Sequence, residues 1–202
     1  MSLSRPIPSR RASADTAPRP ISLVPPAAVA ADAPGINIVY AVRGCVIGHI
    51  RNMTFCAWDA PPQAQHVEAF TALAAQLTQT YALCSNVSLV LRNADLPGDE
   101  ARVALERLTS EYARSIHSVA LVIDGSGFRA SIIRSFLTGL HLLRGNGYRC
   151  KTFAKPTEAN PWLLPAHNAD TAITLTEREM QEACEAIFAR MSQESAPAAR
   201  SG

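Results

Sequence analysis

The feature that most constrains the fold is a nearly unbroken apolar run, Ser118–Ile123, with helical patterns on both sides of it. An apolar run of this kind is typical of a central strand whose two faces are both covered. Such strands occur in sheets whose parallel members are joined by helices that lie on the sheet. The chain is therefore expected to be an α/β protein.

Strand and helix patterns alternate along most of the chain. The first β-branched runs are broken at Arg43-Gly44 and predict a hairpin or meander, and the later runs predict parallel strands. The expected strands are Ile36–Val42, Cys45–Ile50, Met53–Trp58, Asn86–Leu91, Ser118–Ile123 and Arg149–Phe153. The expected helices are Gln63–Tyr81, Asp99–Ser115, Phe128–Leu143, Pro156–Leu163 and Glu177–Met191. This order predicts a mixed sheet covered by helices, with one additional helix at the C-terminal end.

Both ends of the sequence have the composition of disordered tails. Residues 1–36 contain seven prolines among alanine, serine and arginine, and they cannot bury enough apolar surface to offset the entropy lost on ordering. Residues 193–202 are similar, so a single domain is predicted over residues 37–192. The apolar face of the helix Glu177–Met191 must pack on its own domain or on a partner, and a homodimer through this helix is one hypothesis.

The charge balance argues against a nucleic-acid partner. The formal net charge is +2, and the arginines of the first 36 residues account for it. Proteins that bind nucleic acid usually carry a basic stripe on the folded domain, because neutralising phosphates supplies much of their affinity. The folded part of this sequence has no such stripe.

The five cysteines are widely spaced and lie in apolar runs. Their odd number and the lack of a C-x-x-C pair predict reduced core thiols, with neither disulfides nor a zinc site. The sequence has no signal-peptide pattern and no run of about 18 apolar residues. We expect a cytoplasmic protein with no transmembrane segment, no metal and no cofactor.

The most suggestive motif is G-S-G-F-R-A at positions 125–130, between a predicted strand and a predicted helix. In dinucleotide-binding proteins, glycines at this spacing let the backbone approach a pyrophosphate at the helix N-terminus. Here the motif follows a late strand, and the next strand, Arg149–Phe153, does not end in the acid that would hold a ribose. A tight strand-to-helix turn, with Ser126 or Asp124 capping the helix, is the simpler interpretation.

Loops that precede helices in an open parallel sheet lie at the carboxyl ends of the strands, where ligands bind. The predicted binding edge combines the loop before Asp99 with the turn after Ile123, and a phosphate or phosphoserine at Ser126 is one hypothesis for it. The candidate binding residues are Asp95, Asp124, Gly125, Ser126, Gly127 and Arg129. The five histidines are scattered and none lies in a hydrolase or metalloprotease motif, so no catalytic residues are predicted.

Three short motifs in order resemble the STAS fold, in its branch of bacterial proteins similar to anti-sigma-factor antagonists (SpoIIAA-like). They are the strand Val119-Ala120-Leu121-Val122, a strand that ends in Phe153, and a helix with Glu158, Ala159, Trp162 and Leu163. The likeness covers residues 37–164, and Pro161 within the last motif is expected to shorten its helix. Known antagonists carry a phosphorylated serine in a D-S-S-G-L loop, which positions 124–128 resemble. That loop, however, lies one strand–helix unit later here.

The resemblance implies a non-enzymatic regulatory module of bacterial signalling that binds a partner protein or a small ligand. The loops that precede the helices would supply its binding surface. The alternative is a nucleotide- or anion-binding protein, or an enzyme, that uses the Gly125–Gly127 turn.

Overall fold

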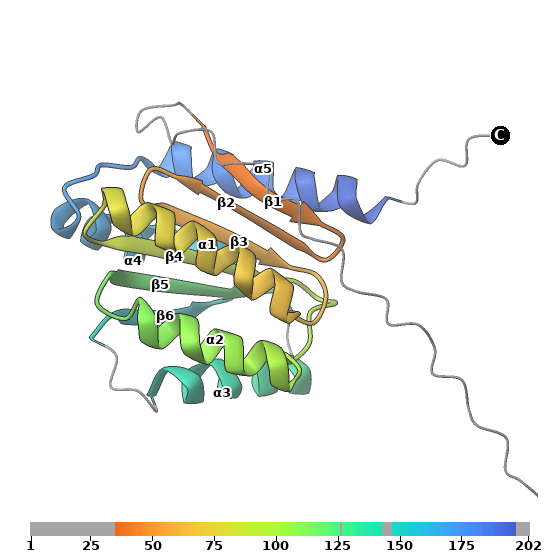
Figure 1. Cartoon of the computed structure of the whole chain (residues 1–202). Helices are drawn as coiled ribbons and strands as arrows, with labels where there is room; N and C mark the ends of the chain where they lie inside the picture. Colours follow the sequence, from red (N-terminus) through yellow and green to blue (C-terminus); the bar gives the residue numbers. More distant parts are fainter. Residues whose placement is uncertain (1–34, 126, 143–146, 197–202) are drawn as a thin grey trace, which may run out of the picture.

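The strands form one mixed sheet, which confirms the predicted α/β fold. The computed structural model describes residues 35–125, 127–142 and 147–196. Within them six strands lie in chain order, with β1 to β3 antiparallel and β3 to β6 parallel (Figure 1). The strands are β1 (Asn37–Val42), β2 (Cys45–Ile50), β3 (Met53–Trp58), β4 (Cys84–Val90), β5 (Ile116–Ile123) and β6 (Arg149–Phe153). Residues 1–34 and 197–202, which make up most of the two predicted tails, lie outside the described residues.

Helices cover both faces of the sheet. The helices are α1 (Ala64–Thr80), α2 (Asp99–Glu111), α3 (Phe128–Leu142), α4 (Pro156–Asp170) and α5 (Glu177–Ser195). Each of α1, α2 and α3 connects two neighbouring parallel strands, and connections of this kind share one hand. These three helices therefore lie on the same face, while α4 and α5 cover the other (Figure 1).

A glycine fixes the turn between β1 and β2. Gly44 has φ +86°, and a Cβ at this position would lie 2.6 Å from the Cβ of Ala60. The turn is also held by Asp59, whose backbone N–H donates to the carbonyl of Gly44 at 2.9 Å. A residue with a side chain is therefore excluded by both backbone conformation and space.

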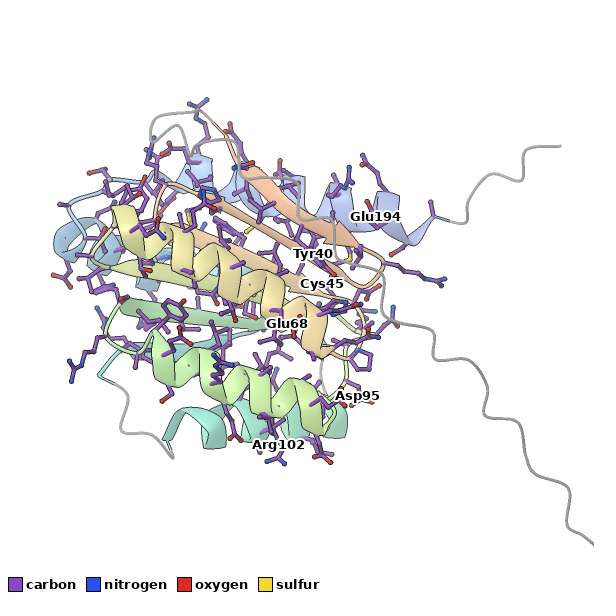
Figure 2. The ribbon with its side chains drawn as sticks, in the orientation of Figure 1. Tyr40, Cys45, Glu68, Asp95, Arg102 and Glu194 are labelled. Atoms are coloured by element: carbon purple, nitrogen blue, oxygen red, sulfur yellow. The ribbon has the colours of Figure 1, made fainter. Side chains whose placement is uncertain are left out.

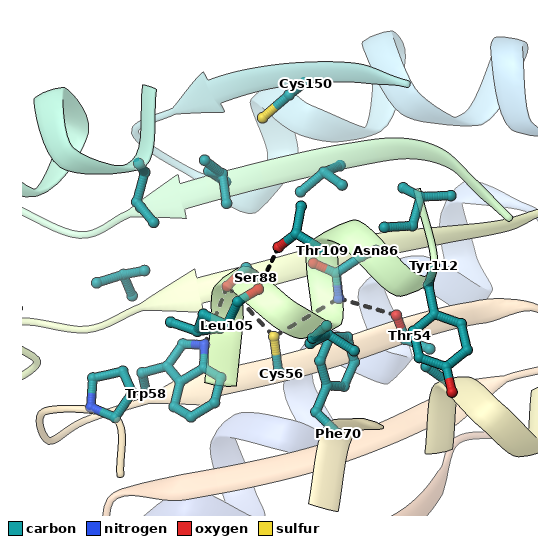
Figure 3. Close-up of a pocket in the computed structure, with 18 of the residues that line it drawn as sticks. Thr54, Cys56, Trp58, Phe70, Asn86, Ser88, Leu105, Thr109, Tyr112 and Cys150 are labelled. Atoms are coloured by element: carbon teal, nitrogen blue, oxygen red, sulfur yellow. Dashed lines mark hydrogen bonds between the residues drawn. The ribbon is translucent and has the colours of Figure 1, made fainter. Parts of the chain in front are cut away.

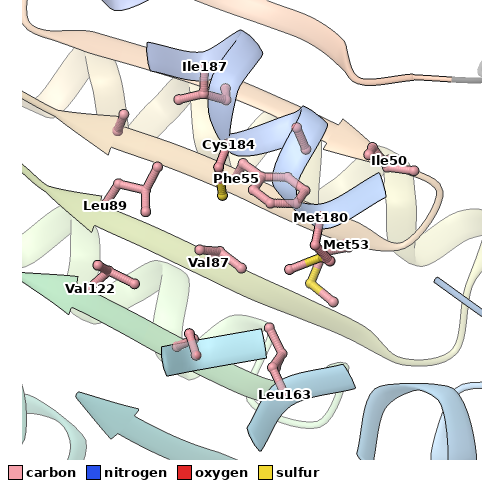
Figure 4. Packing of buried hydrophobic residues seen from close by; sticks show 14 of the residues in the cluster. Ile50, Met53, Phe55, Val87, Leu89, Val122, Leu163, Met180, Cys184 and Ile187 are labelled. Atoms are coloured by element: carbon pink, nitrogen blue, oxygen red, sulfur yellow. The ribbon is translucent and has the colours of Figure 1, made fainter. Parts of the chain in front are cut away.

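The face under α4 and α5 is a closely packed apolar core (Figure 4). Phe55 of β3, Val87 and Leu89 of β4, and Val122 of β5 all point to this side and are buried. Helix α5 adds a buried stripe against β1 to β3, made of Met180, Ala183, Cys184, Ile187 and Met191. The apolar face of α5 is thus used within its own domain, and a dimer through this helix would have to use its charged outer face.

Helix α4 differs from the prediction. It begins at Pro156 as expected but continues to Asp170, with Pro161 and Pro165 inside it. The expectation that Pro161 shortens this helix is therefore wrong. The burial of Leu163 against the sheet offsets the hydrogen bonds that the prolines cannot make, because most helix stability in proteins comes from packing.

Several other boundaries also differ from the prediction. Helix α2 ends at Glu111, where the prediction had Ser115, and β5 begins at Ile116, two residues before the predicted start. Helix α5 continues to Ser195, so residues 193–195 belong to a helix. Among the described helices, none is both long and apolar enough to cross a membrane.

Candidate functional site

A cavity of about 200 Å³ lies between the sheet and α1, α2 and α3 (Figure 3). Its walls are mostly apolar, with Phe70 and Leu77 from α1, Leu105 from α2 and Leu137 from α3. Phe70, Leu105 and Leu137 remain partly accessible although they point toward the sheet. The residues of β3, β4 and β5 that face α4 and α5, such as Phe55, Leu89 and Val122, are by contrast almost completely buried.

A row of polar side chains crosses the sheet side of the cavity. Thr54, Cys56 and Trp58 alternate along β3, and Asn86 and Ser88 alternate along β4, so all five point to the cavity face. The residues between them, such as Phe55 and Val87, point to the opposite core. We call these five residues the polar row.

Hydrogen bonds join the polar row into one chain (Figure 3). The indole N–H of Trp58 donates to Ser88 Oγ at 3.2 Å, and the thiol of Cys56 donates to the same oxygen at 3.4 Å. The amide nitrogen of Asn86 donates to Thr54 Oγ1 at 3.0 Å and contacts Cys56 Sγ at 3.7 Å. Thr54 in turn donates to the backbone carbonyl of Ser85 at 3.2 Å.

Two hydrogen-bonding positions of this row stay open. Ser88 Oγ accepts two hydrogen bonds, and within the described residues its hydroxyl proton has no acceptor. Asn86 uses its nitrogen, and no described residue donates to its carbonyl oxygen Oδ1. The row can therefore offer a donor from Ser88 and an acceptor from Asn86 to a molecule in the cavity.

The cavity is almost free of charge. Among the described residues that line it, Asp95 is the one aspartate, glutamate, lysine, arginine or histidine. Burial raises the pKa of the Cys56 thiol, and it raises the pKa of Cys84 and Cys150 to about 11, so these thiols stay neutral. Within the described part of the chain, no cluster of three His, Cys, Asp or Glu residues could hold a metal ion.

The cavity reaches the surface at the loop between β4 and α2. Asp95 and Leu96 both line the cavity and are exposed, with 37% of Leu96 accessible. Figure 2 shows Asp95 at the N-terminal end of α2, whereas Arg102 lies on the outer side of the same helix. The carboxylate of Asp95 accepts a hydrogen bond from the backbone N–H of Leu96 at 2.8 Å, which fixes the loop locally.

The structure brings the two predicted binding loops to the same sheet edge. Asp124 pairs with Arg92 of the β4–α2 loop at 3.1 Å. Asn93 of that loop donates to Asp59 of the β3–α1 loop at 3.1 Å. Three successive loops are therefore linked, and among the predicted site residues Asp95 lines the cavity.

The glycine turn after β5 has a backbone reason for its sequence. Gly125 has φ +109° and Gly127 has φ +95°, conformations that favour glycine, and the space beside both is open. Ser126 lies outside the described residues, and the side chain of Arg129 is likewise not described. The turn geometry explains both glycines without requiring a bound phosphate.

A second polar cluster lies at the opposite end of β4 and β5. His117 bridges Ser118 Oγ at 2.9 Å and Asp170 at 2.9 Å, an arrangement of residue types found in hydrolases. Ser118 is 1% exposed and does not line the cavity, so a substrate could not reach its hydroxyl there. This cluster satisfies buried polar groups and is structural.

Sequence reasoning missed the polar row because Asn86–Leu91 was interpreted as an apolar strand. Asn86 and Ser88 lie two residues apart and therefore share a face. In a strand covered by helices on both sides, two polar residues on one face indicate either an internal hydrogen-bond network or a cavity. That alternation is the signal that could have identified the site.

Comparison of the chain with protein-family models, with curated proteins and with solved structures found no match.

Proposed function

We propose that this chain is a non-enzymatic binding module that holds a small, mainly apolar molecule between the sheet and helices α1 to α3. The cavity itself carries the proposal. It offers about 200 Å³ of mostly apolar space that opens at the β4–α2 loop. Concave, mostly apolar sites with a few polar groups are the usual form of a small-molecule site. An apolar ligand that filled this space would remove its lining from water.

The size of the cavity suits a small molecule. An engineered apolar cavity of about 150 Å³ is known to stay dry and to bind benzene. The space here is larger, extends along the sheet from Leu96 to Tyr112, and opens at the β4–α2 loop. It therefore favours an elongated ligand over a spherical one.

A regulatory role is the second part of the proposal. The resemblance to the STAS family supports it, and so does the position of the cavity mouth beside the loops that precede α2 and α3. A molecule entering at Asp95 would change the packing of Leu96, which is exposed at this edge. A partner protein that contacted the edge could then distinguish the filled state from the empty one.

Binding of a nucleotide or another anion has less support. The φ values of Gly125 and Gly127 account for both glycines, and the carboxylate of Asp124 lies beside the turn. A carboxylate at that position disfavours a phosphate.

Binding of N-phenyl-1-naphthylamine, an uncharged apolar dye, tests the proposal. Fluorescence titration should show saturable binding at one site, and Ala74→Phe, which puts a large ring into the cavity from α1, should weaken it about tenfold or more. Ala72→Phe is the matched control, because Ala72 is exposed on the same helix. The proposal is wrong if the dye does not saturate, or if the two variants bind it equally well.

A further inference from the structure

The cavity contains polar groups that its own residues do not satisfy. The hydroxyl proton of Ser88 and the carbonyl oxygen of Asn86 have no partner in the described part of the chain, as shown above. Ser88 is buried and Asn86 is partly buried, and polar groups at such positions are usually paired in native proteins. A ligand in the cavity could pair with both.

The spacing of the two groups selects a chemical pattern. Ser88 Oγ and the amide nitrogen of Asn86 both contact Cys56 Sγ, at 3.4 Å and 3.7 Å, so these two atoms lie within about 7 Å of each other. Both residues point to the same side of the sheet. A secondary amide has an N–H and a C=O that point in opposite directions, so it can reach two partners that are separated by up to about 7 Å. The amide N–H would donate to Asn86 Oδ1, and the amide carbonyl would accept from Ser88.

The surroundings determine where the polar group sits in the ligand. Toward the open end of the cavity, the next residues are Val90 and Leu96, and toward the other end they are Ile116 and Tyr112. The side facing the polar row is mostly apolar and includes Leu105, and the hydroxyls of Thr78 and Thr109 on this side donate to carbonyls of their own helices. The polar group is therefore central, with an apolar part on each side.

The charge of the lining excludes an ionised head group. No lysine, arginine or histidine occurs among the described lining residues, so a buried carboxylate or phosphate would have no counter-ion. The carboxylate of Asp95 at the mouth also disfavours an anion. A buried ammonium group would find the neutral amide oxygen of Asn86, thiols and hydroxyls beside it, and no carboxylate away from the mouth.

From these observations, and resting on the proposed function, we infer that the ligand is uncharged and carries a secondary amide between two apolar parts. Ser88 and Asn86 are then its specificity-determining residues.

Four molecules of similar size test this inference by displacing N-phenyl-1-naphthylamine. N-butylhexanamide has the central amide, and butyl hexanoate replaces its N–H by an oxygen. Decanoate and decylamine carry terminal charges. The amide should displace the dye at about fivefold lower concentration than the ester, because it alone donates to Asn86, and both charged molecules should be weaker still.

Variants assign the preference to the two residues. Asn86→Leu should remove the advantage of the amide over the ester, because the acceptor is lost. Ser88→Ala should weaken both molecules by about fivefold. Val87→Ala, on the same strand but facing α5, is the control for lost stability and should keep the preference. Circular dichroism and melting curves establish that each variant is folded.

The outcomes separate the two proposals. If the dye does not bind, the proposed function fails. If it binds but decanoate, decylamine or the ester displaces it best, the cavity is a ligand site and the amide inference is overturned. The inference is also overturned if the amide preference survives Asn86→Leu.

Discussion

His167 has no solvent exposure and is held between Ser85 of β4 and Thr171 at the end of α4. Its Nδ1 lies 2.9 Å from Ser85 Oγ, so this buried ring is paired on the closely packed side of the sheet. The polar row on the other face differs, because Ser88 and Asn86 each keep one hydrogen-bonding position open. The buried Oδ1 of Asn52 also lacks a partner but does not line the cavity, so an open position indicates a candidate binding residue here only where it faces the cavity, as in Ser88 and Asn86.

The burial of His167 predicts a loss of stability in mild acid. Burial, with a smaller contribution from nearby His117, lowers the pKa of His167 to about 4. The unfolded chain, with a histidine pKa of about 6.5, therefore takes up a proton before the folded one does. The contribution of His167 to stability should be constant above about pH 6.5 and fall by up to about 3 kcal/mol as the pH is lowered to 4.

Urea unfolding at pH 7, 6 and 5 measures this effect, and His167→Gln is the comparison. The variant should lose most of the dependence and keep a smaller part from His49 and His66, whose pKa values burial also lowers. An equally steep dependence in the variant would show that His167 is not responsible.

At the scale of elements, α5 shows how an amphipathic helix is attached to a sheet. Thr176 and Glu179 form a reciprocal cap at its start, and Arg51 of the β2–β3 turn donates to Glu179 at 2.9 Å. The apolar stripe that follows is buried against β1 to β3. A capped start and a buried stripe together make α5 part of the core and not a separable arm.

Substitution in that stripe should therefore destabilise the whole domain. Ile187 is 0% exposed, and Ile187→Ala should lower the free energy of unfolding by about 2–5 kcal/mol through lost burial and a new cavity. Glu185→Ala, on the exposed side of the same helix, should change it by less than about 0.5 kcal/mol. Denaturant unfolding measures both, and similar small effects would mean that α5 does not contribute to the core.

The elements were largely predictable because hydrophobic periodicity reports which face of a strand or helix is buried. The stripe of α5 and the strand Arg149–Phe153 were predicted from it directly. The length of α4 was not predicted, because Pro161 has a low helix propensity and indicated a short helix. Burial of the helix against the rest of the domain outweighs that propensity. The candidate site was not predicted either. The spacing of Asn86 and Ser88 indicates a shared polar face, but their pairing with Thr54 and Cys56 depends on the order of strands in the sheet, which no local pattern reveals.

At the scale of the whole molecule, the sheet divides two unlike layers. Helices α4 and α5 lie against strands whose facing residues are buried, whereas α2 and α3 lie over the cavity. Regions with fewer packed apolar contacts open more readily in native proteins. The layer over the cavity should therefore be the part that adapts to a ligand.

Hydrogen exchange measured with and without the dye tests this division of the molecule. Without ligand, backbone amides in the middle of α2, such as that of Leu108, should exchange at least about tenfold faster than those around Ile187 of α5. With dye at 100 times its Kd, exchange through openings that empty the cavity should slow about 100-fold, because the protein must release the ligand before it opens. Fraying at the end of α5, after Met191, does not open the cavity, so the dye should not change the exchange rates of the amides there. Equal protection of α2 and α5 without ligand would contradict the two-layer description. It would also be contradicted if the dye slowed exchange equally in α2 and at the end of α5.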